Sequence, residues 1–160
     1  MNFQEQVESY LNLSYRYLSI RNRSVKEIRD YLMKKNATGE IIDKVVSLLL
    51  EKKFLNDEVF AQAWVSNRAR LKPKGKALLK FELRQKGITD EIITKVLTQA
   101  QEEIPDELEQ AKSLITKRME RLAGRPRKEI YSKIGGFLSR RGFSWDIVKK
   151  AIDDSLENRV

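Results

Sequence analysis

One short unit recurs three times along this chain and constrains its fold more than any other feature. Its clearest copy spans Leu79–Leu97, where one apolar helical stripe ends at Lys86-Gly87 and Thr89 opens the next. A cation in the last turn followed by Gly is a common helix end, and Thr is a favoured N-cap. The unit therefore predicts a helix, a glycine turn and a second helix with one apolar face.

The other two copies lie about fifty residues before and after this one. In the earlier copy, at residues 28–47, Asn36 takes the place of Gly87; in the later copy, at residues 134–152, Gly142 does so. Asn also tolerates the left-handed backbone that ends a helix at Gly. A repeat of this length indicates an array of similar helical units, each of which leans on its neighbours.

A further helix precedes each helix pair. Small, bulky and aliphatic side chains recur along it at helical spacing, followed by Arg21, Arg68 and Arg118. Each unit therefore contains three predicted helices, about nine in all. We expect an all-α fold of three tandem three-helix repeats in an elongated, curved, solenoid-like arrangement. The predicted repeats are residues 1–55, 56–104 and 105–160.

Composition excludes several classes of active site. The 160 residues include no Cys and no His, which removes disulfides, thiol nucleophiles, imidazole bases and Cys/His metal sites. Lys74-Gly75-Lys76 is only a fragment of a phosphate-binding loop. We therefore expect no catalytic residue, no metal, no cofactor and no enzyme activity. The N-terminus does not resemble a signal peptide, and no apolar run approaches the ~20 residues that cross a bilayer, so we expect a cytoplasmic protein that does not bind membranes.

Basic residues supply the main functional signal. The chain has 32 Lys and Arg against 23 Asp and Glu, a net charge of +9. Two dense basic runs, at residues 68–86 and 117–141, each cover the end of a first helix, a loop and a second helix. Such a surface suits a polyanion, because neutralising phosphates releases counterions. A solvated face that only keeps the protein soluble is the alternative.

The predicted binding residues come from these runs and from the equivalent loop of the first repeat. They are Arg21, Arg23, Arg68, Arg70, Lys72, Lys74, Lys76, Lys80, Arg84, Lys86, Arg118, Arg121, Arg125, Arg127, Lys128, Arg140 and Arg141. For the equivalent residues Arg21, Arg68 and Arg118, a binding role and a structural role are equally supported, since a cation near a helix C-terminus is itself favoured by roughly 0.3–1 kcal/mol.

The aromatic residues have their own predictions. Tyr17 and Trp64 lie on the apolar stripe of their helices and are predicted to anchor the core. Trp145 follows the helix cap Ser144, where the other repeats carry Gly39 and Asp90. We expect Trp145 to be exposed, either as a partner contact or as packing at the end of the chain, and packing is the favoured interpretation.

Several segments resemble the RecX family of regulators of the RecA recombinase. Residues 54–68, FLNDEVFAQAWVSNR, resemble the central LDDERFARAWVRSR segment of that family. Residues 83–88 resemble its LRQKGI motif, and residues 16–24 and 138–144 resemble its N- and C-terminal repeats. The order of the motifs is that of the family, and the resemblance covers nearly the whole chain.

Three departures from the family pattern are modest. Asn56 replaces the first acid of the central segment, Val59 replaces an Arg, and Asn36-Ala37 replaces the Gly-aromatic turn of the first repeat.

The resemblance implies a bacterial cytoplasmic protein that binds RecA and its filament on single-stranded DNA. It would lie in the filament groove and modulate, usually inhibit, strand exchange, ATP hydrolysis and co-protease activity, in homologous recombination, DNA repair and the SOS response. The expected partners are RecA and single-stranded DNA, with double-stranded DNA as a further candidate, and the expected state is a monomer. Two alternatives are a DNA-binding protein unrelated to RecA, either sequence-independent or of the helix-turn-helix class, and a helical adaptor that binds only protein.

The loop between the first two helices of the second repeat is the predicted centre of action. Lys72, Lys74 and Lys76 flank Pro73 and Gly75 there. Exposed loop side chains contribute little to stability. Reversal of the three lysines to Glu is therefore expected to abolish RecA regulation while the fold is retained.

Overall fold

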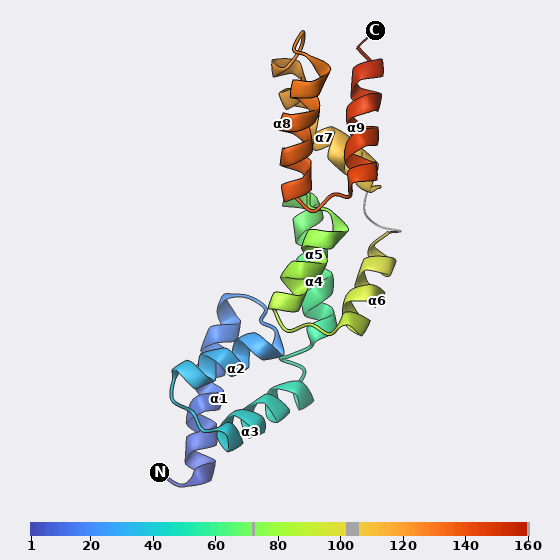
Figure 1. Ribbon diagram of the computed structural model, residues 1–160. Coiled ribbons are helices and arrows are strands. Elements are labelled where there is room, and N and C mark those ends of the chain that lie inside the picture. Colours follow the sequence, from blue (N-terminus) through green and yellow to red (C-terminus); the bar gives the residue numbers. More distant parts are fainter. Residues whose placement is uncertain (72, 102–105, 160) are drawn as a thin grey trace. The chain divides into compact units, whose positions relative to one another are not determined.

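A computed structural model of the chain describes residues 1–71, 73–101 and 106–159, and its regular structure in those ranges is entirely helical (Figure 1). The described residues form nine helices: α1 (Phe3–Ile20), α2 (Val25–Lys34), α3 (Gly39–Glu51), α4 (Asp57–Leu71), α5 (Lys76–Gln85), α6 (Asp90–Ala100), α7 (Glu107–Arg121), α8 (Arg127–Arg140) and α9 (Trp145–Glu157). The prediction of an all-α chain built from helix triplets is confirmed.

Two compact units divide the chain, and each is described by itself. The first unit is Met1–Ala63 with Leu83–Ile93, and the second is Trp64–Glu82 with Thr94–Val160. The division falls within the second helix triplet, so that α4, α5 and α6 each contribute residues to both units.

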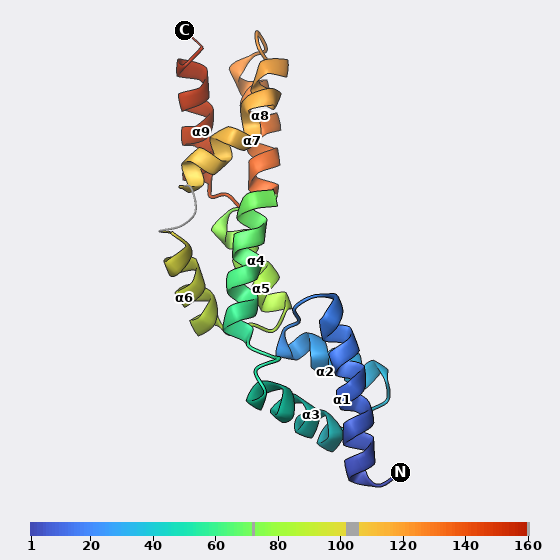
Figure 2. The ribbon, with the colours of Figure 1, turned by 180° about the vertical axis from the view of Figure 1, so that it is seen from behind.

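The first unit contains the core formed by α1, α2 and α3. In both views of the ribbon, α3 lies beside α1 and α2, against which it packs (Figures 1 and 2). The two apolar pairs of α3, at i and i+4, provide much of this core, as the helical period predicts. Its buried residues are Val7, Ile28, Leu32, Ile41, Ile42, Val45, Val46, Leu49 and Leu55.

The second unit contains the core formed by α7, α8 and α9. Figure 2 shows α7 crossing the other two helices, and α7 packs on both of them. The buried residues of this core are Ala111, Ile115, Met119, Ile130, Ile134, Leu138, Phe143, Val148, Ala151 and Ile152.

The helix ends follow the local signals. Ser24 and Glu27 form a capping box at the start of α2, as their spacing in the sequence indicates, and the side-chain oxygen of Asn56 accepts from the backbone N–H groups of Glu58 and Val59 at 3.0 and 3.1 Å. The turns between second and third helices have positive φ at each predicted position: 64° at Asn36, 77° at Gly87 and 85° at Gly142.

Two of these turns also lie directly against another helix. A Cβ added to Gly87 would lie 2.6 Å from the Cβ of Lys26, and one added to Gly142 would lie 2.3 Å from the Cβ of Leu78. Gly is thus needed both for positive φ and for close approach. At the equivalent turn of the first triplet, Asn36 is exposed and takes a φ of 64°.

Candidate nucleic-acid interface

The structure sorts the predicted binding residues by their partners. Ion pairs hold Arg21, Arg68, Lys74, Arg84, Lys86, Arg125 and Arg127. Aromatic rings lie beneath Arg23, Arg68, Arg118, Arg127 and Arg141. No ion pair with another described residue is formed by Lys76, Lys80, Arg121, Lys128 and Arg140. Lys72 lies outside the described residues, and so does the side chain of Arg70.

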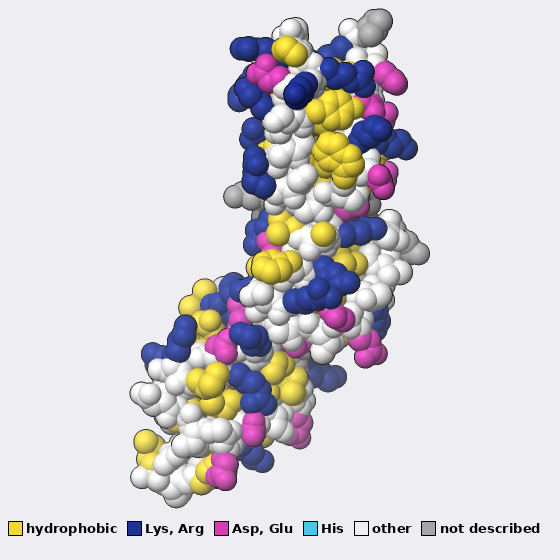
Figure 3. Space-filling model, viewed as in Figure 1, with side chains coloured by type: hydrophobic (Ala, Val, Ile, Leu, Met, Phe, Trp, Pro, Cys, Tyr) yellow, Lys and Arg dark blue, Asp and Glu magenta, His cyan; other side chains and the backbone are white. Residues whose placement is uncertain are grey.

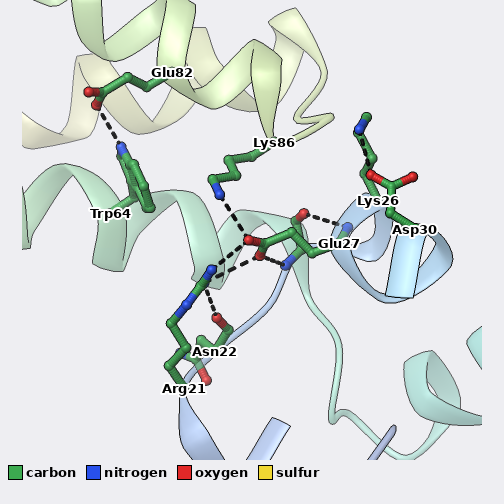
Figure 4. Close-up of polar contacts among 9 residues, drawn as sticks. Arg21, Asn22, Lys26, Glu27, Asp30, Trp64, Glu82 and Lys86 are labelled. Atoms are coloured by element: carbon green, nitrogen blue, oxygen red, sulfur yellow. Dashed lines mark hydrogen bonds and ion pairs between the residues drawn. The ribbon is translucent and has the colours of Figure 1, made fainter. Parts of the chain in front are cut away.

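Glu82 on α5 forms ion pairs with two cations of the basic run at residues 68–86. Its carboxylate accepts from Trp64 Nε1 at 3.0 Å (Figure 4), forms an ion pair with Lys74, and lies 3.9 Å from Arg68 Nε. The Lys74 side chain is only 18% exposed. The expectation that Lys74 is a free cation on an adaptable loop is therefore wrong, because the single acid of this run lies across the loop from it.

Backbone hydrogen bonds hold the same loop in place. The N–H of Gly75 donates to the carbonyl of Arg141 at 2.7 Å, and the N–H of Lys76 donates to the carboxylate of Glu107 at 2.8 Å. The start of α5 is therefore attached to the turn between α8 and α9. This contact brings together two basic runs that lie in separate repeats of the sequence.

Lys74→Glu should destabilise the second unit. The new carboxylate would face Glu82, and removal of one partner from a poorly exposed ion pair costs roughly 3 kcal/mol. Lys128→Glu reverses an exposed, unpaired charge in the same unit and should change the free energy of unfolding by no more than about 0.5 kcal/mol. Urea denaturation of both variants tests this; equal midpoints would show that the Lys74–Glu82 pair has no structural role.

An arginine lies over an aromatic ring in each helix triplet. The pairs, measured from Cζ to ring centroid, are Arg23 over Tyr17 at 3.8 Å, Arg68 over Trp64 at 4.6 Å and Arg118 over Phe137 at 3.9 Å. Stacking pre-orients a guanidinium, so less rotamer entropy is lost when it binds a phosphate. Tyr17 and Trp64 are both half-buried, and Tyr17 packs against the first core as predicted while its ring also contacts Arg23.

The series of Arg21, Arg68 and Arg118 does not behave uniformly. Arg68 and Arg118 stack on aromatic rings. Arg21 instead pairs with Glu27 at 2.6 Å, and in the first triplet it is Arg23 that stacks on a ring. The unequal partners indicate a structural role for Arg21 and leave the stacked arginines as binding candidates.

Glu27 caps the start of α2 and also forms ion pairs that no local sequence pattern predicts. Its carboxylate accepts from Arg21, from Lys86 Nζ at 2.9 Å and from the N–H of Ser24 at 3.0 Å (Figure 4). Burial by itself raises the pKa of Glu27, but hydrogen bonds from Arg21 and Lys86 outweigh it and lower the pKa to about 2. Arg21 and Lys86 are therefore held by this carboxylate.

The cations without an ion pair form two groups in the second unit. Lys76 and Lys80 lie on α5, whose first turn contacts the turn that follows Arg140. Arg121 ends α7 and Lys128 lies in the first turn of α8. Figure 3 shows Lys and Arg side chains over α5 and along α8 and α9. Cations distributed in this way can contact several phosphates, and such contacts do not depend on the base sequence.

Comparison with known proteins identifies the family. Residues 11–49, 56–97 and 105–152 match the first, second and third three-helix domains of RecX, respectively. A RecX regulatory protein of Chlorobium limicola is 30% identical over 84% of this chain and 82% of its own length. The chain belongs to the RecX family. The RecX regulatory protein of Bacillus pumilus is 35% identical over 99% of this chain, which spans only 60% of that relative.

Solved RecX structures share the fold. The crystal structure of RecX from Lactobacillus salivarius superimposes with a TM-score of 0.84 at 25% identity, over 95% of this chain and 97% of that one. The relatives are named regulatory proteins, which agrees with the expectation that this chain is not an enzyme. Within the described ranges, no helix is long and apolar enough to traverse a bilayer.

Proposed function

We propose that this RecX-family chain regulates RecA by binding the RecA filament on single-stranded DNA. The proposed effect is inhibition of strand exchange, ATP hydrolysis and co-protease activity, in recombination, DNA repair and the SOS response. The protein acts as a monomer in the bacterial cytoplasm, and residues 1–55, 56–104 and 105–160 are its binding modules. The observation that carries the proposal is the match of all three RecX domains, in order, to this chain.

The unpaired cations of the second unit support a phosphate-binding surface. An exposed Lys or Arg without a partner keeps its full charge for phosphate, whereas one already paired must first lose its ion pair. Of the predicted residues, the exposed Lys76 and Arg140 and the half-buried Lys80 form no ion pair with a described residue, and they therefore have priority over Lys74 and Lys86. Binding of this kind is indifferent to sequence and falls steeply with salt.

Reversal of Lys76, Lys80 and Arg140 to Glu should abolish inhibition of RecA-dependent ATP hydrolysis on single-stranded DNA. Each lost phosphate contact should also reduce the slope of log affinity for single-stranded DNA against log salt by about 0.7. The matched control reverses Lys34, Lys44 and Lys52, three exposed lysines of the first unit that form no ion pair with a described residue. Normal inhibition by the folded first variant would move the interface elsewhere, and equal loss in both variants would indicate a non-specific charge effect.

A DNA-binding protein unrelated to RecA is the second candidate. In a helix-turn-helix protein the third helix of a triplet would enter the major groove. The solvent face of α3 carries Glu40, Asp43 and Glu51, which repel phosphate. Titration against unrelated duplexes distinguishes the candidates, because a strong preference for one sequence would favour this alternative.

A further inference from the structure

Trp145 is exposed and yet held in a fixed position. It is one of two tryptophans, begins α9, and leaves 56% of its surface exposed. Its ring lies on Gly135 of α8, where an added Cβ would be 3.3 Å from Trp145 Cζ3. Gly inside a helix costs about 1 kcal/mol relative to Ala. The absent side chain lets the indole approach α8 closely while much of the indole stays open to solvent.

A second ring extends the same surface by one helical turn. The Tyr131 ring lies 6.4 Å from that of Trp145, with 51° between the planes. The Tyr131 hydroxyl donates to Asp153, which also binds Arg127 at 2.9 Å. Arg127 in turn lies 5.6 Å from the Tyr131 ring. Figure 3 shows hydrophobic side chains along the seam between α8 and α9, with Lys and Arg side chains and several Asp and Glu side chains around them.

The charges around the seam favour a polyanion as its occupant. The Arg127 side chain is 68% exposed and neutralises Asp153. Lys149 lies one helical turn after Trp145 on α9, is exposed and forms no ion pair with a described residue, and Asp146 is an exposed acid next to Trp145. An aromatic surface bordered by cations suits a strand that offers stacking bases and phosphates together. A duplex buries its bases in the helical stack and does not offer them.

We propose that the seam between α8 and α9 is a stacking site for the bases of single-stranded nucleic acid, with Trp145 as its principal surface. The inference deepens the proposed function, on which it rests, by assigning base stacking to the third domain and phosphate contacts to the unpaired cations. Stacking of this kind tolerates any base sequence, because every base has a π face.

Trp145→Ala is expected to weaken binding of a labelled oligo(dT) strand about tenfold, as loss of one base stack predicts. Trp145→Phe should retain most of the affinity, because it keeps an aromatic face. Both variants should keep the wild-type salt slope, since no phosphate contact is lost. An abasic strand of the same length is the matched control, and the Ala variant should bind it as the wild type does.

Fluorescence provides a direct measurement. In a Trp64→Phe background, Trp145 is the only tryptophan. With excitation selective for tryptophan, its emission should be quenched by oligo(dT) and not by the abasic strand. Anisotropy of the labelled strand with wild-type Trp64 gives the same comparison if the background variant is unstable. Equal binding of oligo(dT) by wild type and Trp145→Ala, or equal loss on both strands, would overturn the proposal.

The RecA ATP hydrolysis assay distinguishes failure of the stacking proposal from failure of the proposed RecA regulation. Loss of RecA inhibition by Trp145→Ala with unchanged DNA binding would assign the seam to a protein contact and overturn base stacking while RecA regulation stands. Base-dependent DNA binding without any effect on RecA would support the stacking site and refute the proposed function.

Discussion

Gly142→Ala should strongly destabilise the second unit. The residue has φ +85°, and an added Cβ would lie 2.3 Å from the Cβ and 2.6 Å from the backbone N of Leu78. A left-handed conformation costs a non-glycine residue roughly 1–2 kcal/mol, and a backbone atom in the first turns of α5 cannot move aside cheaply. We expect a total loss of more than about 3 kcal/mol in the free energy of unfolding, measured by urea denaturation.

Gly124→Ala is the matched control for this substitution. Gly124 has φ +80°, but no atom lies within 4 Å of an added Cβ. It should therefore show the conformational cost alone, roughly 1–2 kcal/mol. Equal losses in the two variants would mean that the close approach to Leu78 contributes nothing.

Acidification should expose the contribution of Glu27 to stability. The pKa of this carboxyl is lowered from 4.5 to about 2 in the folded chain. A lowered pKa means that the stabilisation is complete above about pH 5 and is lost as pH falls through 4.5 toward 2. A difference of this size corresponds to at most about 3 kcal/mol, and solvent screening of this partly buried group reduces it. Glu27→Gln should therefore be less stable than the wild type by roughly 1–3 kcal/mol at pH 7.

The same two proteins compared at low pH show in which direction the stability difference changes with pH. Near pH 2 the wild-type carboxyl is about half protonated in the folded chain and almost fully protonated in the unfolded chain, so most of its stabilisation is lost. The stability gap between wild type and Glu27→Gln should therefore nearly close. Glu8→Gln, at an exposed position of α1 with no ion pair to a described residue, should show no gap at either pH. A Glu27→Gln gap that stays constant from pH 7 to pH 2 would contradict the assigned ion pairs.

The sequence alone was sufficient to predict the helices, their ends and the family. The caps at Ser24 and Asn56 and the turn at Gly87 depend on residues within about one helical turn, and apolar periodicity assigns each helix its buried face. Such signals lie next to one another along the chain. The RecX motifs are likewise short, contiguous segments.

Only the tertiary structure decided which charges and rings are available to a partner. Lys74 finds its acid 8 residues away, and Lys86 finds Glu27 59 residues away. The predicted set of basic residues therefore contained the unpaired cations without distinguishing them from the paired ones. The contact between Trp145 and Gly135 could not be predicted from the sequence either. Exposure and ion pairing depend on how helices pack, and packing brings together residues that no local pattern connects.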